Sequence, residues 1–375
     1  MLRAPGHKTK GETTILPLAS RRPLSIAIVA PPWLPIPPRG YGGTENVLDS
    51  LAKGLQAAGH EVLLCSTGDS TCPVPISYLF DKAVGVGTGN GLHEIRHVLH
   101  SYEAARDADI VHDHTLIGPL QSMAYPHLPV VTTNHGPFDA DLIDLYRTLG
   151  QRLPVIAVSH HQASTAEGVP ISAVIHHGVD VADFPAGVGG GGYALFLGRM
   201  NAGKAPHVAA EIARAAGYRL LIAAKMREPA EKEYFDAKVR PLLGQDVAYV
   251  GEVEREAKLE LLRGADCLLN PIAWPEPFGM VMLEALACGT PVLTTPWGAA
   301  PEIVLDGEVG FVRAGSAELG AALSRLGEID RADCRARAAT HFSVDQMVAK
   351  HVALYEETLA LSRRAAREVR RPGAA

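Results

Sequence analysis

The sequence has no hydrophobic run that could cross a membrane. A membrane-spanning helix needs about 18 or more apolar residues in a row, and the apolar stretches of this chain are much shorter. The first 22 residues carry several basic side chains but no hydrophobic centre, so they do not resemble a signal peptide. We expect residues 1–22 to form a disordered tail, and we expect a cytoplasmic protein without a transmembrane segment.

Cysteine is scarce and shows no pairing pattern. The chain has five cysteines, an odd number, and no two of them form a Cys-x-x-Cys pair. They are Cys65, Cys72, Cys267, Cys288 and Cys334. This pattern favours reduced, buried thiols and disfavours a fold held together by disulfides.

Positive charge is scarce in the first half of the chain. Residues 23–180 contain 7 Lys and Arg against 15 Asp and Glu, a formal charge of −8, whereas the whole chain carries −6. An acidic surface disfavours binding to nucleic acid and to anionic lipid. The arginines within residues 363–375 are interpreted as a solvated basic helix end. We therefore expect no nucleic-acid partner.

The sequence does contain a repeated alternation of strand-like and helix-like segments. Apolar runs of strand length, such as residues 24–30 and 61–66, alternate with segments of helical spacing, such as residues 231–243. This pattern is typical of parallel, doubly wound α/β sheets with helices on both faces. Because the alternation occurs twice, we predict two Rossmann-like domains that face a cleft.

The domain boundaries follow from the same pattern. We predict a first domain over residues 23–180, a second over residues 181–345, and a C-terminal helix and tail over residues 346–375. Residues 179–192 are interpreted as the interdomain linker, with the glycines at 189–192 as a flexible stretch.

One segment of the second domain carries most of the functional signal. Residues 275–291 read PEPFGMVMLEALACGTP, and their two prolines hold Glu276 extended, so that a helix begins after Pro277. The unpaired N–H groups at this helix start favour an anion such as a phosphate. Glu276 and Glu284 can then accept hydrogen bonds from sugar hydroxyls, which indicates a nucleotide sugar. The residues at the helix start are Phe278, Gly279, Met280 and Val281.

The same segment resembles the EX7E signature of retaining glycosyltransferases of family 4, which have the GT-B fold. Seven residues separate Glu276 from Glu284, and the flanking residues agree with the family as well. The resemblance covers about residues 24–360. It implies an acceptor-binding first domain, a nucleotide-sugar-binding second domain and a C-terminal helix that crosses back to the first. It further implies that Glu276 holds the donor sugar and Glu284 the ribose, without a metal or another cofactor.

A second motif, GRMNAGK at residues 198–204, matches most of a phosphate-binding P-loop. It lacks the Ser or Thr that would hold Mg²⁺ after the lysine, because Ala205 stands there. Arg199 and Lys204 are instead suited to neutralise a diphosphate. The arrangement is similar to the phosphate-binding pair of family 4, which implies that role for Gly198, Arg199 and Lys204.

Four further residues complete the predicted donor site. Gly42 and Gly43 stand between a strand and a helix, where their N–H groups can face a phosphate, although such a pair is also common in tight turns. His135 follows a predicted strand, and the resemblance implies that it orients the donor sugar or its phosphates. By the same resemblance, Val253 lies in the loop that receives the nucleotide base.

Other chemistries fit the sequence less well. His112 and His114 share a strand face, but no third ligand is spaced to join the histidine pairs into a zinc site. The D-x-D sequences at 107–109 and 139–141 are typical of metal-dependent GT-A enzymes, yet both also fit ordinary surface acids. A GT-B phosphorylase, an epimerase or an inert sugar-nucleotide-binding module would use the same cleft. The joint presence of two phosphate-binding cations and Glu276 favours transfer.

The acceptor is the least constrained part of the prediction. We expect a UDP-sugar donor of the hexose type and a small-molecule hydroxyl acceptor in natural-product biosynthesis, with front-face attack and no metal. Asp139, Asp141 and Asp144 lie close to His135 in the sequence and suggest an acceptor that bears an amine, although a solvated acidic helix face explains the aspartates equally well. We expect His114, Asp139 and Asp141 to bind the acceptor. A lipid or polysaccharide acceptor is the alternative, and a homodimer is left open.

Overall fold

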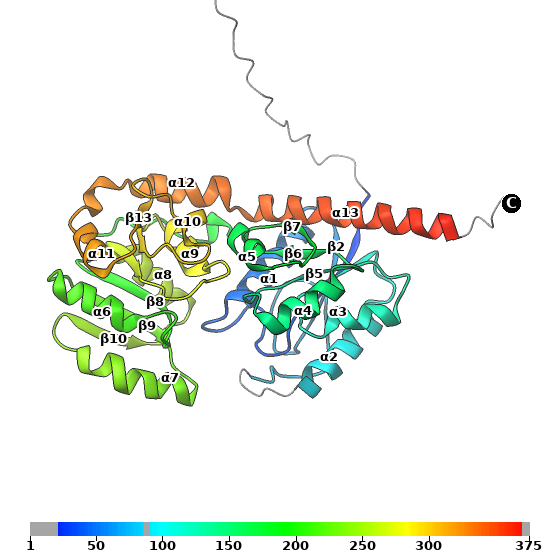
Figure 1. The fold of residues 1–375 in the computed structure, drawn as a ribbon, viewed down its shortest axis with the longest axis horizontal. Helices are drawn as coiled ribbons and strands as arrows, with labels where there is room; N and C mark the ends of the chain where they lie inside the picture. The colour runs from blue at the N-terminus through cyan, green and yellow to red at the C-terminus, as the bar shows by residue number, and fades with distance from the viewer. Residues whose placement is uncertain (1–21, 86–90, 370–375) are drawn as a thin grey trace, which may run out of the picture.

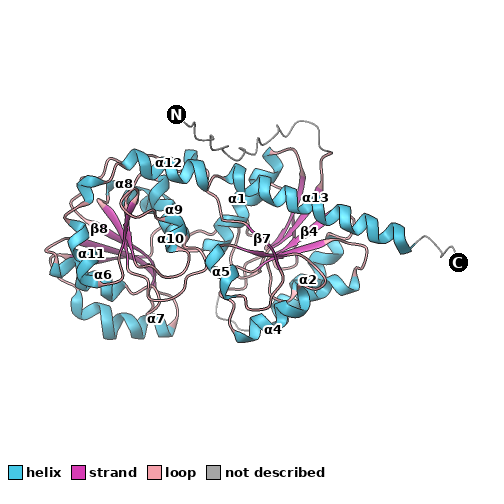
Figure 2. Cartoon of the chain, turned by 45° about the horizontal axis from the view of Figure 1, so that its top comes forward, coloured by secondary structure: helices cyan, strands magenta, loops and turns pink. Residues whose placement is uncertain are grey.

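Two parallel β-sheets form the cores of the two halves of the chain (Figure 1). The structure is a computed structural model that describes residues 22–85 and 91–369, so the tail expected over residues 1–22 lies outside the described residues except for Arg22. The first sheet has 7 strands in the order β3-β2-β1-β4-β5-β6-β7, and the second has 6 in the order β10-β9-β8-β11-β12-β13. Helices cover both sheets (Figure 2). The prediction of two Rossmann-like domains is confirmed.

The elements of the first domain begin at β1 and end at β7. Its strands are β1 (Ser25–Val29), β2 (Glu61–Ser66), β3 (Ile76–Tyr78), β4 (Ile110–Asp113), β5 (Val130–Thr133), β6 (Val155–Ala157) and β7 (Ile171–Val174). Its helices are α1 (Gly43–Ala57), α2 (Gly91–Ala104), α3 (Gly118–Gln121), α4 (Ala140–Leu149) and α5 (His160–Thr165).

The second domain repeats this arrangement. Its strands are β8 (Ala194–Arg199), β9 (Leu220–Lys225), β10 (Val247–Gly251), β11 (Cys267–Asn270), β12 (Val292–Thr294) and β13 (Gly310–Val312). Its helices are α6 (Pro206–Ala215), α7 (Pro229–Tyr234), α8 (Arg255–Gly264), α9 (Met280–Ala287), α10 (Ala300–Ile303), α11 (Ser316–Leu323) and α12 (Arg331–His341), followed by α13 (Val344–Val369).

The helix predicted over residues 231–243 is interrupted. Helix α7 ends at Tyr234, a π-helical turn follows over Phe235–Val239, and a 3-10 turn over Arg240–Leu242 closes the segment. Pro241 cannot donate a backbone hydrogen bond and therefore does not continue the helix. The apolar spacing that suggested one helix comes from side chains such as Phe235 and Val239, which are buried in the domain core.

The glycine-rich stretch before β8 is held against the second domain, contrary to the prediction of a flexible linker. The N–H of Gly187 donates to Cys288 O (2.8 Å), that of Gly189 to Arg263 O (3.0 Å) and that of Gly191 to Gly264 O (3.0 Å). A Cβ atom at Gly187 would lie 2.4 Å from Arg263 Cα. The glycines at 187 and 191 therefore serve the close approach of two backbones rather than flexibility.

The chain passes between the domains at two places that lie side by side. Val179 N donates to Phe342 O (2.9 Å), and Val344 N donates to Val179 O (3.3 Å). Val179 and Ser343 thus form a parallel bridge outside the two sheets. Gly178 permits this contact, because a Cβ there would lie 2.6 Å from Ser343 O.

Helix α13 lies along the first domain beside α1 (Figure 1). Its buried face includes Met347, Val352 and Tyr355, which join the core that α1 covers. Gly54 on α1 allows close packing, since a Cβ at this position would lie 2.6 Å from Val344 Cγ1. Over the two described stretches of the chain, no helix has both the length and the hydrophobicity to cross a membrane.

A carboxylate of the second domain holds the first domain near this crossing. Glu302 on α10 accepts hydrogen bonds from the backbone N–H groups of His160 (3.0 Å) and His161 (2.7 Å) at the start of α5. Its Oε2 also lies 2.8 Å from His176 Nε2. Burial alone would raise the pKa of Glu302, but the hydrogen bonds from His176 and from the two N–H groups outweigh burial and lower it. Glu302 is therefore an interdomain clasp that works as a carboxylate.

We expect Glu302→Gln to lower the melting temperature at pH 7 by about 2–4 °C, because hydrogen bonds to a charged group contribute on the order of 2 kcal/mol. Because the pKa of Glu302 is lowered in the folded protein, its carboxylate stabilises the fold at pH values above the pKa that it has in the unfolded chain. This stabilisation is lost as the pH falls through the pKa of the folded state. The difference between wild type and variant, measured by calorimetry, should shrink below about pH 4. Glu233→Gln, at an exposed position of α7, is the control and should change little. A difference in melting temperature that did not shrink at low pH would contradict the role of Glu302 as a charged clasp.

Candidate active site

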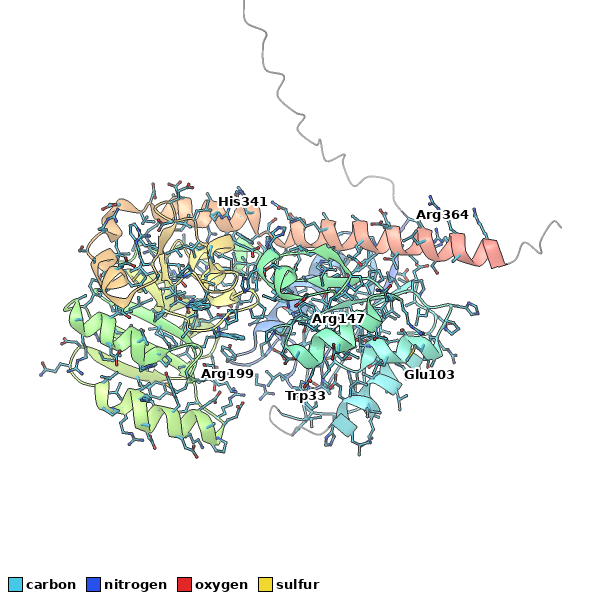
Figure 3. The ribbon with its side chains drawn as sticks, viewed as in Figure 1. Trp33, Glu103, Arg147, Arg199, His341 and Arg364 are labelled. Atoms are coloured by element: carbon cyan, nitrogen blue, oxygen red, sulfur yellow. The ribbon has the colours of Figure 1, made fainter. Side chains whose placement is uncertain are left out.

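A cleft of about 1350 Å³ lies between the two domains and is lined by residues of both. Trp33 from the first domain and Arg199 from the second lie on facing sides of it (Figure 3). The lining comes from loops after β1, β5 and β8 and from the start of α9. Ligands of parallel α/β sheets bind at the carboxyl ends of the strands. In this protein the carboxyl ends of strands from both sheets lead into the cleft. The volume exceeds the roughly 300–1,000 Å³ of ordinary small-molecule pockets and leaves room for two substrates.

Helix α9 presents its N-terminus to the cleft, as the sequence predicted. Gly279 precedes the helix with φ = +107°, a backbone conformation that favours glycine. A Cβ at this position would also lie 2.4 Å from Met282 Cε. The first N–H groups of a helix have no intrahelical partner and carry partial positive charge, so they suit an anion. The predicted residues Phe278, Gly279, Met280 and Val281 all line the cleft.

A buried ion pair stands beside this helix start. Lys204 Nζ donates to Glu276 Oε1, and less than a tenth of either residue is exposed. Burial alone would lower the pKa of Lys204, but the Glu276 carboxylate outweighs it, so the pKa is raised and the ammonium stays charged. Glu276 Oε2 is buried and has no hydrogen-bond partner within the described residues. The pair therefore offers one carboxylate oxygen to a ligand.

Arg199 lies at the carboxyl end of β8, where its guanidinium is tethered from two sides. Its Nε is 3.6 Å from Glu231 Oε1, and its Cζ lies 5.8 Å from the centre of the Tyr41 ring. Lys225, at the end of the adjacent strand β9, also lines the cleft and pairs with Glu228 (2.7 Å) and Glu231 (3.3 Å). The sequence prediction missed Lys225, although its place at a strand end could have indicated it.

The second glutamate of the motif has its own lysine. Glu284 on α9 is buried, and its Oε1 accepts a hydrogen bond of 2.7 Å from Lys258 Nζ on α8. Both residues line the cleft, and so do Gly198 and Val253. Lys258 was not predicted, because no motif marks it and only the folded domain brings α8 against α9.

The first domain contributes the start of α1 to the cleft. Gly42 and Gly43 line it at this helix end. Tyr41 N donates to Glu252 Oε1 across the cleft (3.1 Å), and Glu252 also binds the guanidinium of Arg227 (2.7 and 2.8 Å). The loop before α1 is thus in contact with the loop that contains Val253.

His135 lines the cleft, as expected, and belongs to a group of histidines. His135 Nε2 lies 2.9 Å from Nδ1 of the buried His114, and its ring stacks on His177 with centroids 5.2 Å apart. Burial lowers the pKa of His135 to about 4, so the ring is neutral at pH 7. His177 also lines the cleft and packs against Phe278, a contact that the sequence did not predict.

The three predicted acceptor-binding residues do not line the cleft. His114 lies behind His135 and is almost fully buried. Asp139 is the N-cap of α4 and accepts a hydrogen bond from Leu142 N (2.9 Å), and Asp141 is exposed in the first turn of that helix. The placement therefore does not support an amine-binding group of aspartates. The first domain lines the cleft with the apolar residues Trp33, Leu34, Pro37 and Pro38 and with the charged residues Arg39, Glu45, Asp49 and Lys53.

One group of potential metal ligands differs from the sequence-based expectation. His160, His176 and Glu302 bring their ligand atoms within 4.8 Å of one another, so a third ligand does join the histidine pairs. Both carboxylate oxygens of Glu302 already accept backbone N–H groups, which supports the clasp rather than a metal site. None of the three lines the cleft. Asp109 of the first D-x-D sequence accepts a hydrogen bond from Ser25 N (2.9 Å) and has a structural role.

Comparison with known protein sequences identifies relatives of both domains. Residues 41–183 match the family model of Glycosyltransferase Family 4, and residues 192–328 match that of Glycosyl transferases group 1. The phosphatidyl-myo-inositol mannosyltransferase of Mycolicibacterium smegmatis is 27% identical over 319 residues, which cover 76% of this chain and 80% of that protein. A D-inositol 3-phosphate glycosyltransferase of Mycobacteroides abscessus is 30% identical over 172 residues, or 41% of this chain and 37% of that protein.

Solved structures share the arrangement of both domains. AviGT4, a glycosyltransferase involved in avilamycin A biosynthesis, matches with a TM-score of 0.70 and 27% identity over 90% of this chain and 98% of its own. The Anabaena protein HepE, in complex with UDP and glucose, matches in fold with a TM-score of 0.71 and 19% identity over 89% of this chain and 99% of its own. The chain is a glycosyltransferase with the GT-B fold, built from a domain of Glycosyltransferase Family 4 and a domain of Glycosyl transferases group 1.

Proposed function

We propose that this glycosyltransferase moves a hexose-type sugar from a UDP-sugar to a hydroxyl group of a small molecule, with retention of the anomeric configuration and without a metal. The observation that carries the proposal is the buried pair of Lys204 and Glu276 beside the N-terminus of α9. It places a fixed cation, a carboxylate oxygen without a partner and a set of N–H donors in one cleft. A sugar diphosphate needs all three.

The second domain supplies the groups that a departing diphosphate requires. Arg199, Lys204 and the first N–H groups of α9 neutralise the charge that grows on the phosphates as the sugar leaves. Groups held in place in this way contribute several kcal/mol to lowering a barrier, by a rough estimate. Glu276 Oε2 accepts from donor-sugar hydroxyls, and Glu284 accepts from the ribose. HepE, which has the same fold, was solved in complex with UDP and glucose, and this supports a UDP-sugar donor.

Retention through front-face attack is supported by the state of the two motif carboxylates. Glu276 is held by Lys204, and Glu284 is held by Lys258. In our proposal both carboxylates bind hydroxyl groups of the donor, and neither attacks the anomeric carbon. In our proposal the leaving phosphate takes the proton of the acceptor hydroxyl. Mass spectrometry that trapped a glycosyl–enzyme adduct would contradict this step.

The apolar side of the cleft supports a small-molecule acceptor. Trp33, Leu34, Pro37 and Pro38 offer flat, uncharged surface next to the donor site. The relation to AviGT4, which acts in the biosynthesis of avilamycin A, fits a natural product. The relation to phosphatidyl-myo-inositol mannosyltransferases favours the lipid alternative. An acceptor screen should therefore include natural-product alcohols and phosphoinositide vesicles.

The direct test is a panel of UDP-, GDP-, ADP- and dTDP-sugars, followed by nucleotide release with and without acceptor. We expect UDP-hexoses to give the fastest release, and the same product yield with EDTA. Release of sugar 1-phosphate would indicate a phosphorylase, and an epimerised donor would indicate an epimerase. Absence of nucleotide release with every donor would contradict the proposal.

Lys204→Ala should lower kcat by about 10²–10³-fold, the range found when one preorganised donor to a developing anion is removed. Because the change also leaves Glu276 buried without a partner, the melting temperature is measured in parallel. The control is Lys232→Ala at an exposed position of α7, which removes the same charge outside the cleft. Equal turnover in the two folded variants would contradict the role of Lys204.

Gly279→Ala should weaken UDP binding by tenfold or more, because an alanine cannot adopt φ = +107° without strain at the start of α9. Isothermal titration calorimetry with UDP measures the change. The matched control is Gly217→Ala, which also has a positive φ of +63° but meets no atom within 4 Å of its added Cβ and does not line the cleft. We expect the control to lose about 1 kcal/mol of stability and to keep its affinity for UDP. Equal affinities in both variants would refute the expected role of Gly279.

A further inference from the structure

The hydrogen bond between His114 and His135 can exist in two forms. Nδ1 of His114 and Nε2 of His135 are 2.9 Å apart, and either nitrogen can be the donor. Both rings are neutral, because burial lowers the pKa of His135 to about 4 and holds the pKa of His114 well below its ordinary value. A neutral imidazole carries one N–H, so the choice of donor here fixes the tautomer of both rings.

The surroundings of His114 distinguish the two forms. Its other nitrogen, Nε2, is buried and has no partner among the residues that the structure describes. If His135 donated, His114 would carry its N–H at this buried atom and leave it unsatisfied. If His114 donates from Nδ1, its buried Nε2 carries only a lone pair. Buried N–H groups without a partner are rarer in proteins than buried acceptors without a partner, so this form is favoured.

Another buried histidine of the same domain shows this preference. His97 Nε2 lies 2.8 Å from Ala30 O, and because a carbonyl can only accept, the N–H of His97 is on Nε2. His97 Nδ1 is then a buried nitrogen without a proton and without a partner among the described residues. His97 thus carries its N–H where an acceptor exists, whereas His60, whose Nδ1 accepts from Leu24 N (3.2 Å), carries its N–H on Nε2, a buried atom with no partner among those residues.

We infer that His114 is a positioning residue, whose Nδ1–H donates to His135 Nε2 and thereby makes His135 Nδ1 a hydrogen-bond donor toward the ligand in the cleft. This rests on the proposed function for the identity of the ligand. His135 lines the cleft, and its Nδ1 is not among the buried atoms without a partner. Phosphate oxygens can only accept hydrogen bonds, so a fixed N–H suits them and a lone pair would repel them.

The assignment has a consequence for the reaction. A neutral His135 with its proton on Nδ1 and its lone pair on Nε2 engaged by His114 has no free lone pair for the acceptor hydroxyl. His135 therefore does not act as a general base. Its contribution is a hydrogen bond to an oxygen of the donor sugar or its diphosphate, and the proton of the acceptor leaves by another group.

The tautomer can be measured without turnover. In protein labelled with ¹⁵N at histidine, the shifts of the two ring nitrogens distinguish the protonated from the bare atom. His97, with its proton on Nε2, and His351, whose Nδ1 lies 2.8 Å from Met347 O and must donate, serve as internal references. We expect the signal of His135 to match His351. A signal that matches His97 overturns the inference, whatever the protein transfers.

Two variants of His114 connect the tautomer to activity. Asparagine can donate from nearly the position of Nδ1, whereas leucine cannot donate. We expect His114→Asn to keep kcat within about threefold of wild type and His114→Leu to lose tenfold or more in kcat with little change in donor KM, since misplaced groups act on the chemical step. Melting temperatures and UDP affinity establish that both variants are folded. An equal loss in both variants, or none in His114→Leu, would mean that donation from His114 does not matter.

The outcomes separate this inference from the proposed function. If no nucleotide sugar binds or turns over, but His135 carries its proton on Nδ1, the proposed function fails and the donation from His114 stands. If nucleotide-sugar transfer is found and His135 carries its proton on Nε2, the proposed function stands and the inference falls.

Discussion

The contact between Lys204 and Glu276 is the one on which the arrangement of the cleft depends. It joins the turn between β8 and α6 to the extended segment before α9, and both side chains are buried. Removing two opposite charges from water is unfavourable in itself, so such a pair is weak evidence for stability. The pair makes sense as part of a site, because it fixes a cation beside the start of α9 and leaves the second carboxylate oxygen of Glu276 without a partner among the described residues. The start of α9 completes this surface from the same domain.

The first domain contributes a chain of neutral histidine rings to the cleft. His135 contacts His114, the His112 and His114 rings lie 3.9 Å apart, and His112 Nδ1 is 2.7 Å from the Tyr355 hydroxyl on α13. Helix α13 thus contacts His112, which packs on His114, the residue that supports His135 at the cleft. Burial keeps the histidine rings uncharged, which allows them to pack closely without mutual repulsion.

The sequence predicted those features that are local in the chain. The motif around Glu276 and Glu284 indicated the helix start, the GRMNAGK motif indicated Arg199, and the family resemblance indicated His135 at a strand end. Lys258, His177 and the clasp of Glu302 could not be predicted, because each depends on which elements pack together in space. Asp139 caps helix α4, and the sequence could not distinguish this role from that of a ligand-binding acid, because both fit an aspartate at a helix start. The prediction of a flexible linker before β8 was wrong, because glycine is favoured both in flexible segments and where two backbones pack closely.

The adjacent passages at Val179 and Ser343 determine how the two lobes can move. Because the domains are joined by two adjacent segments, they can rotate relative to each other about a hinge axis that passes through these segments. Glu302 and α5 lie near that axis and travel little, whereas Tyr41 and Glu252 lie at the cleft and separate as soon as the lobes swing apart. Such a swing has to break the hydrogen bond between Tyr41 and Glu252, whereas the contacts of Glu302 with α5 can persist.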